Sequence, residues 1–151
     1  DYDTTWQSPA TDRIFKTSFV SVNFNQASWT QVSPFSTSPL INVGGFSVTS
    51  SAITIPEDGY YWVSFNILFS SSTARTNPGV SVGINGSLDA TIRAAHSYIR
   101  ASNGHNESSS NASGILNLSA GDTLNIFALR YAENGAMNSA AGEGSFNIYK
   151  L

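Results

Sequence analysis

The chain has 151 residues, of which 10 are acidic, 7 are basic and none is cysteine, and only 11% are charged, whereas globular domains carry about 25%. A chain of this length buries the core of one domain without disulfides or structural metal, and the lack of cysteine excludes disulfides and thiolate metal sites. The net charge of −3 excludes a nucleic-acid partner, because phosphate binding needs clustered Lys and Arg. No stretch approaches the roughly 18 apolar residues of a membrane span, so we expect no membrane insertion.

The first 16 residues (DYDTTWQSPATDRIFK) do not alternate between apolar and polar side chains, and Pro9 would interrupt a strand ladder. We therefore expect residues 1–16 to be an N-terminal arm or linker, and residues 17–151 to be a single domain. Because the chain starts at Asp1 without Met, we also expect it to be a processed form or a fragment of a larger protein.

From residue 19 onward, apolar residues recur with a period of two in segments separated by Gly, Pro, Asn and Ser, which is typical of strands. The predicted strands lie near residues 19–24, 46–55, 60–69, 80–84, 88–92, 97–101, 114–118, 123–131 and 145–151. No window of a dozen residues has a helical apolar stripe. The pattern predicts an all-β sandwich or barrel.

Two predicted connections, residues 70–79 (SSSTARTNPG) and 102–113 (SNGHNESSSNAS), are longer than ordinary hairpin loops. Both are rich in Ser and Asn and poor in charge. Exposed loops of this size on a compact domain are mobile or functional, so they are candidate contact regions.

The predicted strands 60–69 and 123–131 are apolar on both faces, whereas a sheet with one wet face should alternate cleanly. In the first strand, the alternate positions from Tyr61 to Phe69 are all apolar, and the opposite face begins with Tyr60 and Trp62. With no helix to cover the second face, we expect another copy of the chain to do so; the alternative is a central strand covered by loops. The expected interface residues are Tyr60, Trp62, Leu68, Leu124, Phe146 and Tyr149.

Three segments resemble a known family pattern. Residues 53–63 (ITIPEDGYYWV) resemble the signature F-T-x-P-x-x-G-x-Y-x-F of the globular heads of the first complement component, whose superfamily includes tumour necrosis factor. Residues 114–124 (GILNLSAGDTL) resemble its G-x-L-x-L-x-x-G-D-x-V segment, and residues 144–148 (GSFNI) resemble its closing strand. The segments follow the family's order and cover about the C-terminal two thirds of the chain.

This resemblance implies a jelly-roll β-sandwich of about ten antiparallel strands that forms a homotrimer through its inner sheet. The family's pattern before the first motif is not recognisable in residues 34–45 (PFSTSPLINVGG), and no acidic cluster matches a calcium site. The absence of cysteines and of a collagen-like start favours a bacterial or viral relative over an animal complement protein. Charge-poor jelly rolls rich in Ser, Asn and Gly resemble the knobs of phage fibres, spikes and capsid decorations.

Catalytic and metal-binding patterns are absent from the sequence: it has no nucleophile elbow, zincin motif, P-loop or dinucleotide fingerprint. The predicted turn positions of Glu57, Asp58 and Asp122 suit backbone hydrogen bonding. His96 and His105 fall in or beside polar loop sequence, where a solvated histidine is the ordinary interpretation. We therefore expect neither enzymatic activity, a metal nor a cofactor.

Aromatic side chains are better candidates for ligand contact, because sugar rings present apolar C–H faces to aromatic planes while amides meet their hydroxyls. Arginines at positions 75, 93, 100 and 130 could bind an anionic sugar, or could be surface charges or intersubunit pairs. The aromatics could equally pack at strand ends. The expected ligand-binding residues are Trp29, Arg75, Asn77, Tyr98, Arg100, His105, Asn106 and Tyr131.

Taken together, these features predict a non-enzymatic, homotrimeric recognition head on a viral or phage spike or fibre. The head would attach to a host cell-surface receptor, with a glycan as the favoured ligand. The arm would lead from a larger stalk or particle, and the protein would lie on the virion surface or otherwise outside the cell. The alternatives are a capsid decoration or cement protein of the same fold, and a monomeric carbohydrate-binding module or lectin.

Overall fold

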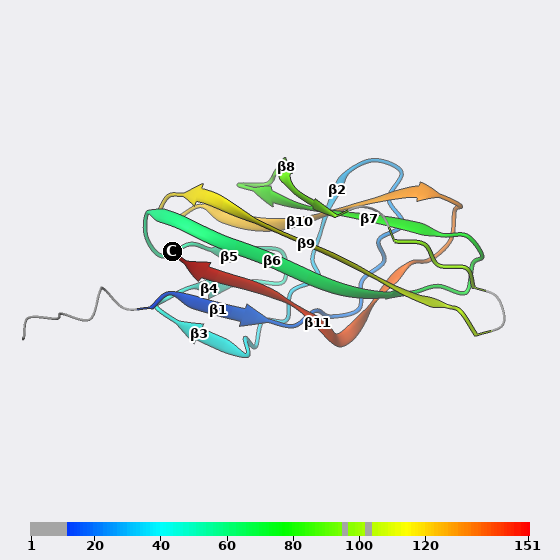
Figure 1. Cartoon of the computed structure of the whole chain (residues 1–151), viewed down its shortest axis with the longest axis horizontal. Coiled ribbons are helices and arrows are strands. Elements are labelled where there is room, and N and C mark those ends of the chain that lie inside the picture. The colour runs from blue at the N-terminus through cyan, green and yellow to red at the C-terminus, as the bar shows by residue number, and fades with distance from the viewer. Residues whose placement is uncertain (1–11, 95–96, 102–103) are drawn as a thin grey trace, which may run out of the picture.

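The computed structural model describes residues 12–94, 97–101 and 104–151. In these residues the chain forms two antiparallel sheets packed face to face, without a helix, in an elongated sandwich (Figure 1). The strands are β1 (Ile14–Thr17), β2 (Thr30–Val32), β3 (Ile41–Val43), β4 (Ser47–Val48), β5 (Ile53–Thr54), β6 (Gly59–Ser70), β7 (Asn77–Ile84), β8 (Ser87–Ala94), β9 (Glu107–Leu118), β10 (Thr123–Ala132) and β11 (Asn138–Lys150). The all-β jelly-roll expectation is confirmed.

The first sheet has the order β3-β1-β11-β6-β9, and the second has the order β4-β5-β10-β7-β8, with β2 paired to β10. The long strand β6 crosses the first sheet from the end near the C-terminus to the opposite end, which we call the distal end (Figure 1). The distal end carries the connections β6–β7 and β10–β11 and the start of β9. Because the long strands run along the length of the sandwich, the connections between them form both ends of the molecule.

The core lies between the sheets and is formed by alternate residues of each strand. In β6, the inward side chains from Tyr61 to Phe69 are 0–2% exposed, as the alternation predicts. From the second sheet, Leu124, Ile126 and Ala128 of β10 are fully buried against them. Four phenylalanines outside the central strands (Phe15, Phe19, Phe24 and Phe35) are also at most 1% exposed. Burial of these large side chains is the main source of stability.

Small residues bring the two sheets together where β8 lies beside β9. Gly114 of β9 faces Ile92 of β8 so closely that an added Cβ would lie 2.8 Å from the Ile92 Cγ1 atom. Ala112 precedes it on the same face of β9 and is partly buried against the core. The two sheets therefore approach closely at this edge.

The observed strands differ from the predicted ones mainly at the periphery. The predicted strand at residues 19–24 forms only isolated bridges, at Phe19 and Asn23, and the predicted strand at residues 97–101 is reduced to a bridge between Ile99 and Thr76. The predicted strand 46–55 is broken into β4 and β5, and β2 and β3 were not expected at all. These pairings of one to three residues are set by neighbouring backbone rather than by local periodicity.

Strand β9 begins seven residues earlier than predicted, within the expected loop 102–113. Its Ser- and Asn-rich start has no apolar alternation, yet it pairs with β6 without interruption from Glu107, opposite Ser70, onward. The backbone of the long β6 supplies hydrogen-bond partners for these polar residues. The connection between β8 and β9 is correspondingly shorter.

The domain boundary expected after residue 16 is wrong, because β1 starts at Ile14 and pairs with both β11 and β3. Phe15 is fully buried in the core. The short β1 was missed because four residues are too few for a periodic signal. Of the expected arm, residues 1–11 lie outside the described residues.

Candidate functional site

The outward face of the first sheet exposes a continuous row of apolar side chains. Val43, Ile14, Tyr149, Trp62 and Ile115 are register partners in turn across β3, β1, β11, β6 and β9. Their side chains share one face of the sheet, and all except the half-buried Ile14 are 40–57% exposed. We call this set, with the adjacent Ile41, Tyr60 and Leu151, the apolar face. Solvated sheet faces are normally polar, so this one is suited to being covered.

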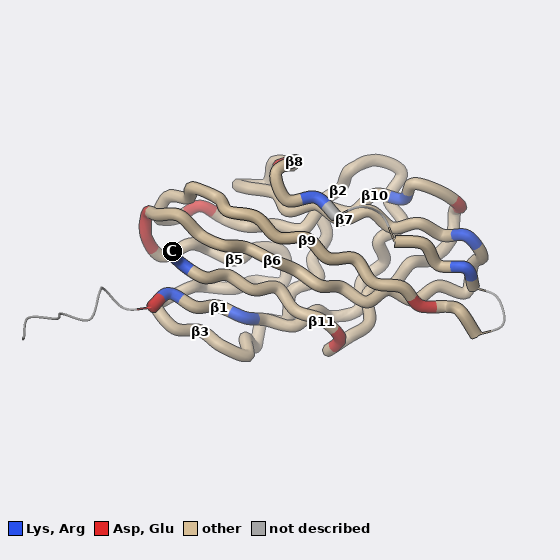
Figure 2. The backbone as a smooth tube through the Cα atoms, viewed as in Figure 1, with Lys and Arg blue, Asp and Glu red and all other residues tan. Residues whose placement is uncertain are grey.

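The same outward face becomes polar toward the distal end without becoming charged. Along β6, Tyr60 and Trp62 are followed by Ser64, Asn66 and the half-buried Leu68. The Asn147 amide of β11 donates a hydrogen bond to the Ser64 hydroxyl at 3.3 Å. Figure 2 shows that the middle of β6 and β9 carries no charged residue. The neighbouring strands of the sheet carry Lys16 in β1 and Glu143 in β11. A second protein surface can therefore cover β6 and β9 without burying unpaired charges.

The expected interface residues divide between this face and the core. Tyr60, Trp62, Leu68 and Tyr149 lie on the outward face. Leu124 and Phe146 are 0% exposed, so their assignment to an intersubunit surface is wrong. Leu124 belongs to the second sheet and points into the sandwich, and Phe146 packs edge-on against Phe35 with ring centroids 5.2 Å apart.

Sequence reasoning missed several members of the apolar face. Ile115 could have been found, because it alternates with the buried Leu116 and Leu118 and must therefore point outward. Ile41 and Val43 carried no such signal, since their strand has only three residues. Their place on the apolar face follows from the pairing of β3 with β1.

At the distal end, an isolated bridge brings together four of the expected ligand-binding residues. The Ile99 N–H donates to the Thr76 carbonyl at 2.9 Å, and the two residues form an isolated antiparallel bridge. Arg75 and Asn77 flank Thr76 in the chain, and Tyr98 and Arg100 flank Ile99, so the bridge holds these four residues near one another. Arg75, Tyr98 and Arg100 are exposed, and no described acidic side chain forms an ion pair with either arginine. Two exposed arginines without an acidic partner suit an anionic ligand.

Arg75 and Asn77 have further unusual features. Arg75 has a φ of 64°, a left-handed conformation that costs a non-glycine residue about 1–2 kcal/mol. The Asn77 Oδ1 atom is buried without a hydrogen-bond partner. Asn77 therefore faces the interior rather than a ligand, which does not fit its expected role. His105 is exposed, and its carbonyl accepts a hydrogen bond from the Ala101 N–H at 2.7 Å.

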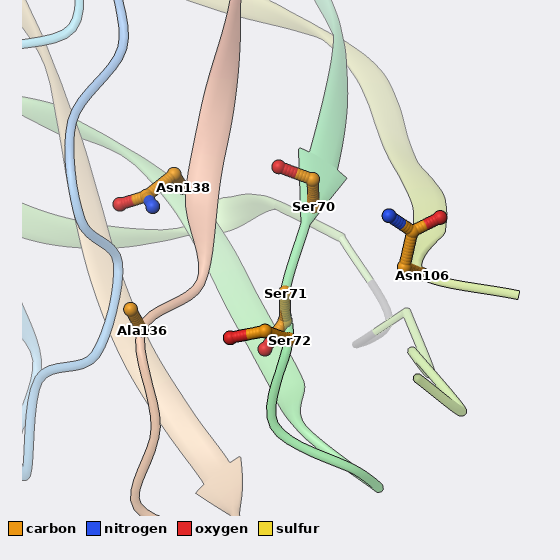
Figure 3. Close-up of a pocket in the computed structure, with 6 residues that line it drawn as sticks. All are labelled: Ser70, Ser71, Ser72, Asn106, Ala136 and Asn138. Atoms are coloured by element: carbon orange, nitrogen blue, oxygen red, sulfur yellow. The ribbon is translucent and has the colours of Figure 1, made fainter. Parts of the chain in front are cut away.

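A polar pocket of about 310 Å³ also lies at the distal end, and Asn106 is on its rim (Figure 3). It is lined by Ser70, Ser71, Ser72, Asn106, Ala136 and Asn138. In Figure 3, the serines at the end of β6 separate Asn106 on one side from Asn138 and Ala136 on the other. The lining offers hydroxyl and amide groups but no charge, which suits a neutral, hydroxyl-rich ligand.

Trp29 and Tyr131 meet on the outward face of the second sheet. Their ring centroids are 6.2 Å apart and their planes are nearly perpendicular, at 84°. Arg93 of β8 places its guanidinium carbon 4.8 Å from the centre of the Trp29 ring. We call Trp29, Tyr131 and Arg93 the aromatic corner. It brings together two expected ligand-binding aromatics and one of the arginines considered for an anionic sugar.

Arg130 is the neighbour of Tyr131 in β10, but its side chain binds other parts of the fold rather than the aromatic corner. Its guanidinium donates hydrogen bonds to the side-chain oxygens of Asn25 at 3.0 Å and Asn134 at 2.6 Å. These bonds tie the segment before β2 to the β10–β11 connection. Arg130 is therefore a structural residue of the distal end.

A second charged group lies at the end of the molecule near the C-terminus. Glu57 accepts hydrogen bonds from Arg13, at 3.0 Å, and from Lys150. These bonds, with the Arg13 bond the stronger cause, lower the pKa of Glu57 from its ordinary 4.5 to about 2. This charge triad joins the start of β1, the turn before β6 and the end of β11, and its single carboxylate is shared by two cations within the fold.

The other acidic turn residues also bind backbone or side-chain amides, as predicted. The Asp58 carboxylate accepts the Ala120 N–H at 2.8 Å. Asp122 accepts hydrogen bonds from the Asn85 amide and the Ser119 N–H, and these, led by the Asn85 bond, lower its pKa. Among the described residues, no group of three or more His, Asp or Glu side chains could hold a metal ion, and no helix is long and apolar enough to cross a membrane. His96 lies outside the described residues.

Comparison with known proteins identifies the fold. The sequence matches no family model and no curated protein. The structure is similar to that of murine APRIL at pH 5.0, with a TM-score of 0.62 and 16% identity over 93% of this chain and 99% of that chain. It is also similar to Eiger TNF from S. frugiperda, with a TM-score of 0.58 and 13% identity over 93% of each chain. The chain has a TNF-like jelly-roll fold.

Proposed function

We propose that the protein is a non-enzymatic, homotrimeric recognition head whose subunits associate through the apolar face. The observation that carries this proposal is the row from Val43 to Ile115, which crosses all five strands of one sheet and is exposed in the single chain. Covering it would remove several large apolar side chains from water. A monomer would leave this contiguous patch in solvent.

The choice of another copy of the same chain as the cover rests on two further arguments. The family that the three sequence segments resemble trimerises through its inner sheet, and the TNF-like fold supports the same arrangement here. The polar half of the face, with Ser64, Asn66 and Asn147, can form reciprocal hydrogen bonds when identical faces meet around an axis. The charge-poor surface permits close approach of three copies.

In such a trimer, the three distal ends would point the same way and present their loops together. Arg75, Arg100, Tyr98 and the pocket beside Asn106 would each be repeated three times. Weak single sites would then give strong attachment through multivalency. This suits the attachment of a viral or phage spike or fibre to a host cell-surface receptor that carries glycans, with the N-terminal residues leading to the stalk or particle and the head outside the cell.

The assembly is tested by the molecular mass in solution. Multi-angle light scattering of the whole chain at micromolar concentration should give three times the chain mass of 16.1 kDa. A stable monomer would refute the proposed function. A trimer that binds no cell surface or glycan would agree with the TNF-like fold but would contradict the proposed recognition role.

Attachment is tested by adding the purified head to candidate host cells and to a glycan array. We expect saturable binding that falls when Arg75 and Arg100 are both replaced by Gln, while the trimer mass is unchanged. If the head binds purified coat shells at symmetric positions and no host surface, it is a capsid decoration protein instead. Turnover of polysaccharides by the wild-type protein would contradict the non-enzymatic proposal.

A further inference from the structure

We propose that the aromatic corner formed by Trp29, Tyr131 and Arg93 is a binding site for a carboxylated pyranose, such as a sialic or hexuronic acid residue of a glycan. This inference rests on the proposed recognition function and names both the ligand chemistry and a site separate from the distal loops. The three residues come from the segment before β2, from β10 and from β8, so the second sheet assembles the corner from distant parts of the chain.

The perpendicular arrangement of the two rings suits a sugar better than a flat ligand. Trp29 and Tyr131 meet at 84°, so they form two walls of a corner. A pyranose can place its apolar C–H face against one ring and its edge against the other. Tyr131 is 44% exposed and Trp29 is half-buried, so the corner is open to solvent while its base is anchored.

Gly79 of β7 provides the space in which the corner forms. A Cβ at this position would lie 2.3 Å from the Tyr131 Cε2 atom and 3.3 Å from the Trp29 Cη2 atom. Any larger residue would displace the rings from the sheet. Because both rings converge on a buried backbone position of a central strand, they are held before a ligand arrives, which lowers the entropic cost of binding.

Arg93 supplies the preference for a negative charge. Its guanidinium carbon lies over the Trp29 ring, 4.8 Å from the ring centre, and a guanidinium held over an aromatic face can still form a bidentate pair with a carboxylate through its N–H groups. No described acidic side chain is within ion-pair distance of Arg93. On the same strand, one oxygen of Asp89 accepts the Thr91 N–H at 2.6 Å, so this carboxylate is engaged locally.

The corner remains accessible in the proposed trimer. It lies on the outward face of the second sheet, whereas the apolar face belongs to the first sheet on the opposite side of the sandwich. Subunit contacts and sugar binding would therefore use opposite faces. Binding at the corner does not require the loops of the distal end.

The test is a titration of the full chain with 3′-sialyllactose and with trigalacturonate, using lactose as the neutral counterpart, followed by calorimetry or ligand-observed NMR. At least one acidic sugar should bind saturably and about tenfold or more tightly than lactose. Trp29→Ala should weaken the acidic sugar by about tenfold or more. Arg93→Gln should remove the preference for the acidic sugar over lactose.

Lys16→Gln is the matched control, because it removes the same unit charge from β1 of the first sheet, on the side of the sandwich opposite the aromatic corner. It should leave the acidic-sugar affinity unchanged. Equal losses from Arg93→Gln and Lys16→Gln, unchanged binding in Trp29→Ala, or no binding of either acidic sugar would overturn the inference. Light scattering of the same samples separates the two proposals: a monomeric wild type refutes the proposed function, whereas a trimer without acidic-sugar binding refutes only the aromatic corner.

Discussion

Replacing Trp62 by Ser should dissociate the trimer while leaving the fold of each chain intact. Trp62 is 40% exposed in the single chain, which for a side chain of roughly 250 Å² leaves about 100 Å² to be covered by neighbouring subunits. At about 25 cal/mol per Å², complete covering stabilises the assembly by about 2.5 kcal/mol per subunit, or about 7.5 kcal/mol per trimer. The trimer association constant should therefore fall by about five orders of magnitude.

The matched control for this variant is Leu88→Ser. Leu88 has a similar exposed fraction, 37%, but belongs to β8 of the second sheet. Sedimentation velocity across a micromolar concentration series should show Trp62→Ser shifted to monomer and Leu88→Ser unchanged from wild type, with far-UV circular dichroism the same for all three. A Trp62→Ser protein that stays trimeric at the wild-type concentrations, or equal dissociation by Leu88→Ser, would refute the assignment of the apolar face.

Three further changes probe the stability of the single chain. The lowered pKa of Glu57, about 2 against an ordinary 4.5, means that the charge triad stabilises the fold above pH 4.5 and less as the pH falls toward 2; the Tm advantage of wild type over Glu57→Gln should vanish over that range, and a pH-independent difference would contradict this. Gly144 and Gly142 have similar positive φ angles of 82° and 76°, but only at Gly144 would a Cβ meet backbone, the Asn66 oxygen at 2.0 Å. Gly144→Ala should therefore lower the free energy of unfolding by about 1–3 kcal/mol more than Gly142→Ala in urea titrations; equal losses would show that the backbone angle alone matters. Tyr61→Phe removes the hydroxyl that donates to the Glu57 carbonyl at 2.8 Å and should cost about 1–2 kcal/mol by the same measurement; a neutral effect would mean that water replaces the bond.

The central strands were predictable because their signals are long and periodic. In β6, the unbroken inward series from Tyr61 to Phe69 identifies both the strand and its core face. The turn role of Asp122 was equally local, since it binds the Ser119 N–H of its own turn. Asp58 also binds a backbone amide, but that amide belongs to Ala120, in a connection far away in the chain. The interface assignment of Tyr60 and Trp62, which remains a prediction, came from the same alternation.

Where both faces of a strand are apolar, the sequence does not show which face is buried in the core. Near the C-terminus, Phe146 and Ile148 lie at alternate positions on one face, whereas Tyr149 and Leu151 lie at the positions of the opposite face. Only packing shows that the first pair is buried, at 0–1% exposure, and that Tyr149 is 42% exposed. The error at Phe146 therefore arose because composition gives no sign of which apolar face meets the opposite sheet.

The sequence by itself determined that this chain is all-β and without disulfides, that it carries little charge, and that its central strand is apolar on both sides. These properties follow from composition and from a period of two, which are local. The tertiary structure decided which apolar residues form the apolar face and brought Trp29, Arg93 and Tyr131 together above Gly79. Those contacts depend on pairing between strands far apart in the chain, and such pairing is settled by packing of the whole sandwich rather than by any local pattern.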